Sequence, residues 1–216
     1  MKYAIVLSGC GVYDGAEIHE ALMTMLAVTR NGGTYELFAP DVKQHHVINH
    51  LTGEEMNETR NVLVESARIA RGKISALDTY NPVDFDALLF PGGFGVAKNL
   101  CTYAFDGPGC EVDRVVEKVI RETHRAGKPI GALCISPVLI TKVLGEVDVT
   151  IGKDEATAAH IEEMGGVHID TGHGEVVVDT ASRIVTNPCY MLDASLDDIA
   201  TGADNVVKSI IELLED

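Results

Sequence analysis

Two kinds of hydrophobic pattern alternate along the chain. Short runs in which nearly every residue is apolar predict buried strands at 2–8, 35–39, 86–90, 129–133, 147–151, 176–179 and 183–186. Longer stretches in which apolar residues recur every three or four positions predict helices at 16–30, 58–71, 111–126, 135–144, 155–164 and 196–214. The polar, histidine-rich stretch 41–57 is expected to be a loop.

The order of these elements predicts an α/β fold. Strands that are apolar throughout, rather than at alternate positions, are typical of a mostly parallel sheet covered by helices on both faces. No linker, repeat or low-complexity tract interrupts the alternation, so we expect residues 1–216 to form one domain. Ligands of such sheets bind beyond the carboxyl ends of the strands. The segments expected at that edge are 9–15, 91–95, the residue at 134, and 187–190.

The charge of the chain argues against several classes of partner. Its 216 residues include 17 Lys and Arg against 33 Asp and Glu, which gives a formal net charge of −16. Nucleic acids and anionic membrane surfaces both need a basic face, so neither is an expected partner. The apolar N-terminal run is too short for a secretory signal, and no segment has the roughly 20 apolar residues of a membrane helix. We therefore expect a cytoplasmic protein.

One of the five cysteines lies in a distinctive place. The cysteines are scattered and form no CxxC motif, which argues against a zinc knuckle or a thioredoxin-like motif. Cys134 lies in the segment 131–137, GALCISP, between a predicted strand and a predicted helix. This context is typical of a nucleophile elbow, and the free amides and partial positive charge of a helix start favour a thiolate. A buried structural cysteine would occupy the same place, so the local sequence leaves both interpretations open.

Two further segments end at the same edge of the predicted sheet. The segment 91–95, PGGFG, follows a strand, and the amides of Gly93 and Ile135 would form an oxyanion hole. Glu20 lies near the start of the helix that follows 9–15, and a carboxyl buried beside a thiol would have a raised pKa and could shuttle protons. An ordinary tight turn, and acids that complement a helix dipole, are the plainer alternatives.

Four segments of the chain, in the order VLSGCGVYDGAEIHE, LLFPGGFGVAKNL, KPIGALCISP and IVTNPCYM, carry a family resemblance. Together they resemble the PfpI-like branch of the class I glutamine-amidotransferase-like superfamily. Within that branch they resemble the glyoxalases associated with isoprenoid biosynthesis. The resemblance implies a flavodoxin-like three-layer sandwich. It implies Cys134 as the nucleophile, Glu20 as a buried proton shuttle and Gly93 as an oxyanion-hole residue. It also implies conversion of small 2-oxoaldehydes such as glyoxal to 2-hydroxy acids such as glycolate through a Cys134 hemithioacetal. The resemblance implies a homodimer, and glutathione, other cofactors and metals are not expected.

Two positions depart from relatives that act on amides. Amidotransferases carry a His on or after a late strand, where this chain has 186–190, TNPCY. PfpI-type proteases carry a His directly after the nucleophile, where this chain has Ile135. Amide chemistry needs a base that activates the thiol and protonates the leaving nitrogen, so an amidotransferase subunit is disfavoured. His173 and Glu175 form a His-x-Glu pair that would supply a second proton-transfer group if the fold brought it to the site.

A redox-sensing or stress-response protein is the alternative function. Cys134 would then be an oxidisable thiol with a depressed pKa and no turnover, with Cys10 as a candidate second thiol. Cys10 and Cys189 both follow strands at the ligand edge, although a packed small residue accounts for each. No metal site is expected from the histidines of the polar loop, which have no Cys partner and no helical pairing: His45, His46 and His50.

Overall fold

Seven strands form the central sheet of the computed structural model, which describes residues 1–215. They are β1 (Lys2–Val6), β2 (Thr34–Ala39), β3 (Ser75–Ala76), β4 (Ala87–Phe90), β5 (Ile130–Leu133), β8 (Val177–Asp179) and β9 (Ile184–Asn187). Their order across the sheet is β3-β2-β1-β4-β5-β9-β8, and all neighbours are parallel except β8, which is antiparallel to β9. The uninterrupted apolar sequence of β4 and β5 allows these strands to be buried on both faces.

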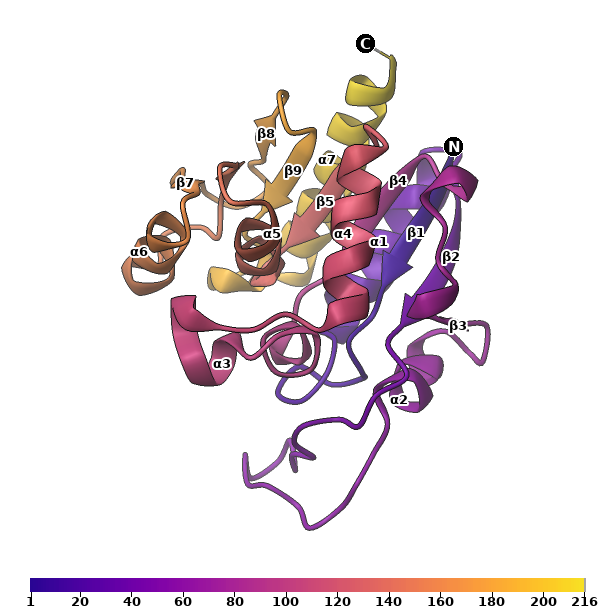
Figure 1. The fold of residues 1–216 in the computed structure, drawn as a ribbon, viewed down its shortest axis with the longest axis vertical. Helices are drawn as coiled ribbons and strands as arrows, with labels where there is room; N and C mark the ends of the chain where they lie inside the picture. Colours follow the sequence, from indigo (N-terminus) through magenta and orange to yellow (C-terminus); the bar gives the residue numbers. More distant parts are fainter. Residues whose placement is uncertain (216) are drawn as a thin grey trace.

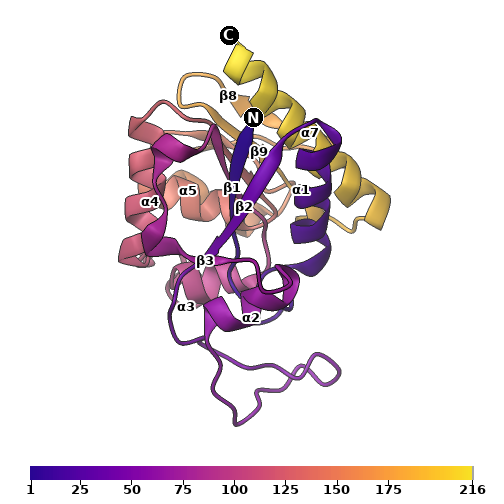
Figure 2. The ribbon, with the colours of Figure 1, turned by 90° about the vertical axis from the view of Figure 1, so that its right-hand side faces the viewer.

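Helices cover both faces of the sheet, so the chain forms three layers, seen edge-on in Figure 2. On one face lie α1 (Ile18–Arg30) and α7 (Leu196–Glu215), which pack against each other, and on the other lie α4 (Arg114–Arg125) and α5 (Ser136–Leu144). The remaining helices are α2 (Val62–Ile69), a π-helix (Val96–Leu100), α3 (Tyr103–Asp106) and α6 (Glu155–Glu163). The predicted flavodoxin-like three-layer α/β sandwich is confirmed.

Each face of the sheet has its own hydrophobic core. Successive strand residues point to opposite faces, so Leu88 packs in the core beneath α4 and α5, and Leu89 packs in the core beneath α1 and α7. The apolar stripe predicted for α4 is buried through Val116, Val119 and Ile120. The two cores fix the strands in register, and therefore fix the positions of the loops at their carboxyl ends.

The late part of the chain differs from the prediction. The strand expected at 147–151 is reduced to β6 (Asp148–Val149), which pairs with β7 (Val167–His168) outside the central sheet. Strands of two residues, such as β3, β6 and β7, are too short to carry a hydrophobic period, so the sequence does not define them.

Two helices begin later than their hydrophobic periods indicate. The helix expected from 58 begins at Val62, because Asn61 acts as its N-cap and its side-chain oxygen accepts a hydrogen bond from the amide of Val64. The helix expected from 111 begins at Arg114, after the side chain of Asp113 caps its first turn.

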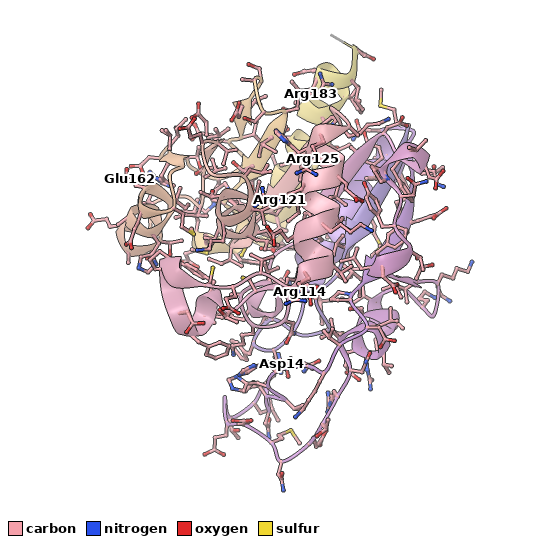
Figure 3. All side chains as sticks on the ribbon, viewed as in Figure 1. Asp14, Arg114, Arg121, Arg125, Glu162 and Arg183 are labelled. Atoms are coloured by element: carbon pink, nitrogen blue, oxygen red, sulfur yellow. The ribbon has the colours of Figure 1, made fainter. Side chains whose placement is uncertain are left out.

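The loop between β2 and α2 projects beyond the carboxyl edge of the sheet, at the bottom of Figure 1. Asp14 lies at the base of this loop, as Figure 3 shows. Its buried carboxylate accepts a 2.7 Å hydrogen bond from the amide of Ile48, and the side-chain oxygen of Asn99 accepts one of 2.9 Å from the amide of His45. These bonds tie the loop to the sheet edge. Among the described helices, none combines the length and apolar character that crossing a membrane requires.

Candidate active site

Cys134 lies at the turn that joins β5 to α5. Its φ is +59°, a left-handed backbone conformation that residues other than glycine seldom adopt. The Cys134 amide donates a 2.9 Å hydrogen bond to the carbonyl of Asn187, which ties the turn to the end of β9. A sharp strand-to-helix turn of this kind is the geometry of a nucleophile elbow, in which the side chain projects beyond the sheet edge.

The loop after β4 approaches the cysteine so closely that it requires glycine. A Cβ atom at Gly92 would collide with the Cβ of Cys134 and would lie 2.7 Å from Oε2 of Glu20. A Cβ atom at Gly93 would collide with the amide nitrogen of Glu17, and the φ of Gly93 is +99°. The PGG segment therefore places backbone N–H groups against the thiol, where a side chain would otherwise stand.

Glu20 is completely buried in the first turn of α1. Its Oε2 accepts a 2.9 Å hydrogen bond from the amide of Gly92, and its Oε1 accepts one of 3.2 Å from the amide of Tyr190. Glu17 caps the helix by accepting a 2.6 Å hydrogen bond from the Glu20 amide. Burial, followed by the negative charge of Glu17, raises the pKa of Glu20 to about 7. The carboxyl can therefore accept and release a proton near neutral pH.

Three groups around the Cys134 thiol can accept its proton or stabilise its negative charge. It is hydrogen-bonded to the Glu20 carboxyl, and the amides of Gly93 and Ile135 donate to its sulfur. Burial, followed by the negative charge of Glu20, raises the pKa of Cys134 well above its ordinary value. The amides of Gly93 and Ile135 favour a thiolate, as expected for a helix start, but burial and the charge of Glu20 outweigh them. The raised pKa also runs against the redox-sensing alternative, which requires a depressed one.

A cavity of about 400 Å³ opens in front of Cys134. Its wall is mostly apolar, and its apolar side chains include Val12, Phe94, Ala97, Ala104, Ile135 and Met191. Besides Cys134, its polar side chains are those of Glu17, Tyr103, Asp154, Thr157 and Tyr190. A larger hollow of about 1030 Å³ lies between α1, β2 and the segment 69–75, and neither Cys134 nor Glu20 lines it. The smaller cavity is therefore the candidate substrate site.

His173 and Glu175 do not line the Cys134 cavity. Both line a separate open hollow beside α7, whose wall includes Thr201 and Asn205. The Glu175 carboxylate accepts a 2.6 Å hydrogen bond from the amide of Gly172, so it stabilises the turn in which it lies. The possible second proton-transfer pair identified in the sequence is therefore not brought to the site.

The remaining candidate thiols and metal ligands are also placed by the fold. Cys189 is buried beside the site, where its Sγ donates to Oδ1 of Asn187 at 3.1 Å, and burial raises its pKa well above the ordinary value. Cys10 does not line the cavity, and burial, followed by the charge of Glu65, raises its pKa. Within residues 1–215, no group of three or more His, Cys, Asp or Glu side chains is arranged to hold a metal ion.

Two tyrosines of the cavity were not identified from the sequence. The hydroxyl of Tyr190 lies 2.9 Å from Nδ1 of His19, and the hydroxyl of Tyr103 lies 2.8 Å from Nδ1 of His160. Tyr190 belongs to the segment 187–190, which was expected at the ligand edge, so its placement could have been inferred. Tyr103 lies on the four-residue helix α3, which is too short to show a hydrophobic period.

The fold and the elbow together define a glutamine-amidotransferase-like α/β protein with a cysteine at the strand-to-helix turn. The chain belongs to the ES1 family of this class. It is 47% identical to the human glutamine amidotransferase-like class 1 domain-containing protein 3, mitochondrial, over 98% of this chain and 83% of that protein. A solved structure of an isoprenoid biosynthesis protein with an amidotransferase-like domain from Ehrlichia chaffeensis is 38% identical over 99% of both chains, with a TM-score of 0.93.

More distant structures share the fold alone. Glyoxalase III from Candida albicans is 15% identical over 99% of this chain and 97% of that chain, with a TM-score of 0.61. No protein-family model matches the chain. The resemblance to the class I glutamine-amidotransferase-like superfamily that the sequence segments indicate is confirmed.

The predicted cytoplasmic localisation is contradicted by these comparisons. The human relative and the related ES1 proteins of Rattus norvegicus and Danio rerio are all named as mitochondrial. Net charge and the pattern of apolar residues do not distinguish one cellular compartment from another. The inference from composition to cytoplasm was therefore unsound.

Proposed function

We propose that the chain is a cofactor-independent glyoxalase that converts small 2-oxoaldehydes, such as glyoxal, to 2-hydroxy acids, such as glycolate. The observation that carries the proposal is the placement of one thiol, Cys134, against a buried carboxyl, Glu20, and two backbone amides at the end of a small cavity. The carboxyl can take the proton of the thiol, and the amides can hold the negative charge of an oxygen on the attacked carbon.

The reaction begins with addition of the thiol to the aldehyde. A bond forms between the Cys134 sulfur and C1, while the thiol proton passes through Glu20 to the aldehyde oxygen, giving a hemithioacetal. The hydrogen of C1 then leaves as a proton and a proton is added at C2, which converts the hemithioacetal to the thioester of a 2-hydroxy acid. Water hydrolyses the thioester and regenerates the thiol. Glyoxal and water thus give glycolate and one proton.

The surroundings of the thiol support a carbonyl substrate over an amide. Amide hydrolysis needs a base that activates the thiol and then, in its protonated form, gives a proton to the leaving nitrogen. Amidotransferases use a histidine for this, whereas the neighbours of the Cys134 sulfur are Glu20 and two amides. An aldehyde has no leaving group, so proton transfer by the carboxyl suffices for addition. The apolar wall suits a small, uncharged 2-oxoaldehyde. A protein of the same fold is named glyoxalase III, which agrees with the proposal.

The test is consumption of glyoxal without glutathione, with glycolate followed by proton NMR. The wild type should form glycolate, and Cys134→Ala should abolish its formation because the nucleophile is lost. Cys10→Ala is the matched control, since Cys10 is a cysteine of this edge that does not line the cavity. Equal rates for the wild type and Cys134→Ala would refute the proposal.

A further inference from the structure

Two tyrosine–histidine pairs border the Cys134 cavity, and the proposed reaction needs a proton-transfer group that has not yet been assigned. Glu20 can move the proton of C1, but the oxygen on C2 also has to gain a proton during isomerisation. Of the polar side chains in the cavity wall, the phenols of Tyr103 and Tyr190 are natural donors to such an oxygen. The two pairs differ in burial and in their other contacts.

The Tyr103 pair faces the cavity from the side of α3 and α6. The Tyr103 hydroxyl is 2.8 Å from Nδ1 of His160 and is also hydrogen-bonded to the side chain of Thr157, which lines the same cavity. Thr157 and His160 are one turn apart on α6, whose N-cap is Asp154. The hydroxyl is therefore held at the cavity wall from two positions on one helix. The phenol of Tyr103 carries its proton at neutral pH, since burial raises its pKa further above the ordinary value, and this proton is available to a developing oxyanion on the substrate.

The Tyr190 pair lies at the surface instead. The side chain of His19, its partner, is 54% exposed, so the Tyr190 hydroxyl is held at the rim. The contact of Tyr190 with the catalytic carboxyl is made by its backbone amide, which donates to Oε1 of Glu20. Its phenol therefore has no required part in that contact.

We propose that Tyr103 is the second proton-transfer group of the reaction and that His160 positions its hydroxyl; this inference rests on the proposed glyoxalase function. When His160 carries a proton on Nδ1, it donates to the phenol oxygen, which leaves the phenol hydrogen free to point at the substrate and stabilises the phenolate that forms. Thr157 accepts or donates at the same oxygen and fixes its place.

The protons balance between two groups. Glu20 takes the proton of C1 while Tyr103 gives its proton to the oxygen on C2, which yields an enediol bonded to the Cys134 sulfur. Glu20 then returns its proton to C2, and the hydroxyl on C1 returns a proton to Tyr103. The product is the thioester, with both groups restored. Formation of the hemithioacetal precedes these steps and does not use Tyr103.

The test compares Tyr103→Phe with Tyr190→Phe and Tyr13→Phe. Tyr103→Phe should lower kcat for glyoxal by about 10²-fold with little change in KM, the scale expected on removing a general acid. Tyr13→Phe is the matched control, because Tyr13 stacks on His50 outside this cavity and should leave kcat unchanged. Thermal unfolding of each variant checks that the fold is retained, since only a hydroxyl is removed.

Two readouts separate a proton-transfer role from a structural one. Tyr103→Phe should still form the Cys134 adduct, seen as a gain of the mass of glyoxal by intact-protein mass spectrometry under non-denaturing conditions, whereas Cys134→Ala should not form it at this site. Deuterated glyoxal should also show a larger isotope effect with Tyr103→Phe, because proton transfer then limits turnover. Wild-type kcat in Tyr103→Phe, or an equal or greater loss in Tyr190→Phe, would overturn the assignment. Absence of Cys134-dependent turnover in the wild type would instead refute the proposed function.

Discussion

Replacement of Glu20 by Gln removes a titrating group from the interior without removing its bulk. Glu20 is completely buried and receives hydrogen bonds from the amides of Gly92 and Tyr190 on its two oxygens. Gln keeps one acceptor oxygen and presents an NH₂ group in place of the other. At the acid end of the range, where the wild-type carboxyl is protonated, the variant should therefore be less stable by about 1–3 kcal/mol for the lost hydrogen bond. The pH dependence of its stability should also lack the contribution that the titration of Glu20 makes in the wild type.

The size and sign of that component follow from the pKa of Glu20. Burial raises it from 4.5 to about 7, so the native state holds a proton that the unfolded state releases between these pH values. Stability from this group is fully present below pH 4.5 and is lost as the pH rises through about 7. A shift of this size corresponds to roughly 3 kcal/mol, since one pKa unit is about 1.4 kcal/mol.

The assay is urea unfolding at a series of pH values from about 4.5 to about 8, followed by circular dichroism. Over that range, the wild type should lose roughly 3 kcal/mol of stability relative to Glu20→Gln. Glu54→Gln is the control, because Glu54 is exposed and its replacement should leave the pH dependence unchanged. Parallel curves for the wild type and Glu20→Gln would refute the conclusion that burial raises the pKa of Glu20 in the folded protein.

Two further predictions concern packing around the site. Gly92→Ala should abolish glycolate formation and lower the free energy of unfolding in urea by about 1–3 kcal/mol, because the added Cβ would collide with Cys134. Gly109→Ala is the control: the space around Gly109 is open, so glycolate formation and stability should both be unchanged. Asp14→Ala should lower the free energy of unfolding by about 1–3 kcal/mol, because the amide of Ile48 loses its hydrogen-bond acceptor. Limited proteolysis should then cleave the loop 41–61 faster than in the wild type. An unchanged cleavage rate would show that the loop does not depend on this hydrogen bond.

The architecture was predictable from the sequence because each main strand and helix has a hydrophobic period of its own. The stripe of α4 and the apolar runs of β4 and β5 are long enough to define both the type of element and its burial. The pairing of β6 with β7 was not predictable, because two residues have no period. Helix starts at Val62 and Arg114 were set by Asn and Asp caps rather than by apolar residues.

The candidate site was predictable only as far as it lies at strand ends. Cys134, Gly93 and Glu20 were placed at one edge by the rule that loops of a parallel sheet meet there, together with a family resemblance. The contact between Tyr103 and His160 could not be predicted from the sequence, because it joins α3 to α6 across 57 positions and neither helix belongs to the regular layers. Conversely, His173 and Glu175 look like a catalytic pair in sequence, but the fold directs them into another hollow.

The raised pKa values of Glu20 and Cys134 describe one pair of coupled groups rather than two independent acids. Burial and the repulsion between the two negative charges disfavour ionisation of both groups at once, so the sulfur ionises only when Glu20 holds a proton. Its charge arises only as the bond to the substrate forms, when the proton moves to Glu20 and the negative charge moves to an oxygen that the amides of Gly93 and Ile135 can hold. A peroxide sensor needs a standing thiolate, since the thiolate is the species that peroxide oxidises. A carbonyl-adding enzyme needs only a proton acceptor within reach. The same burial that weakens the case for a sensor is therefore compatible with the proposed addition chemistry.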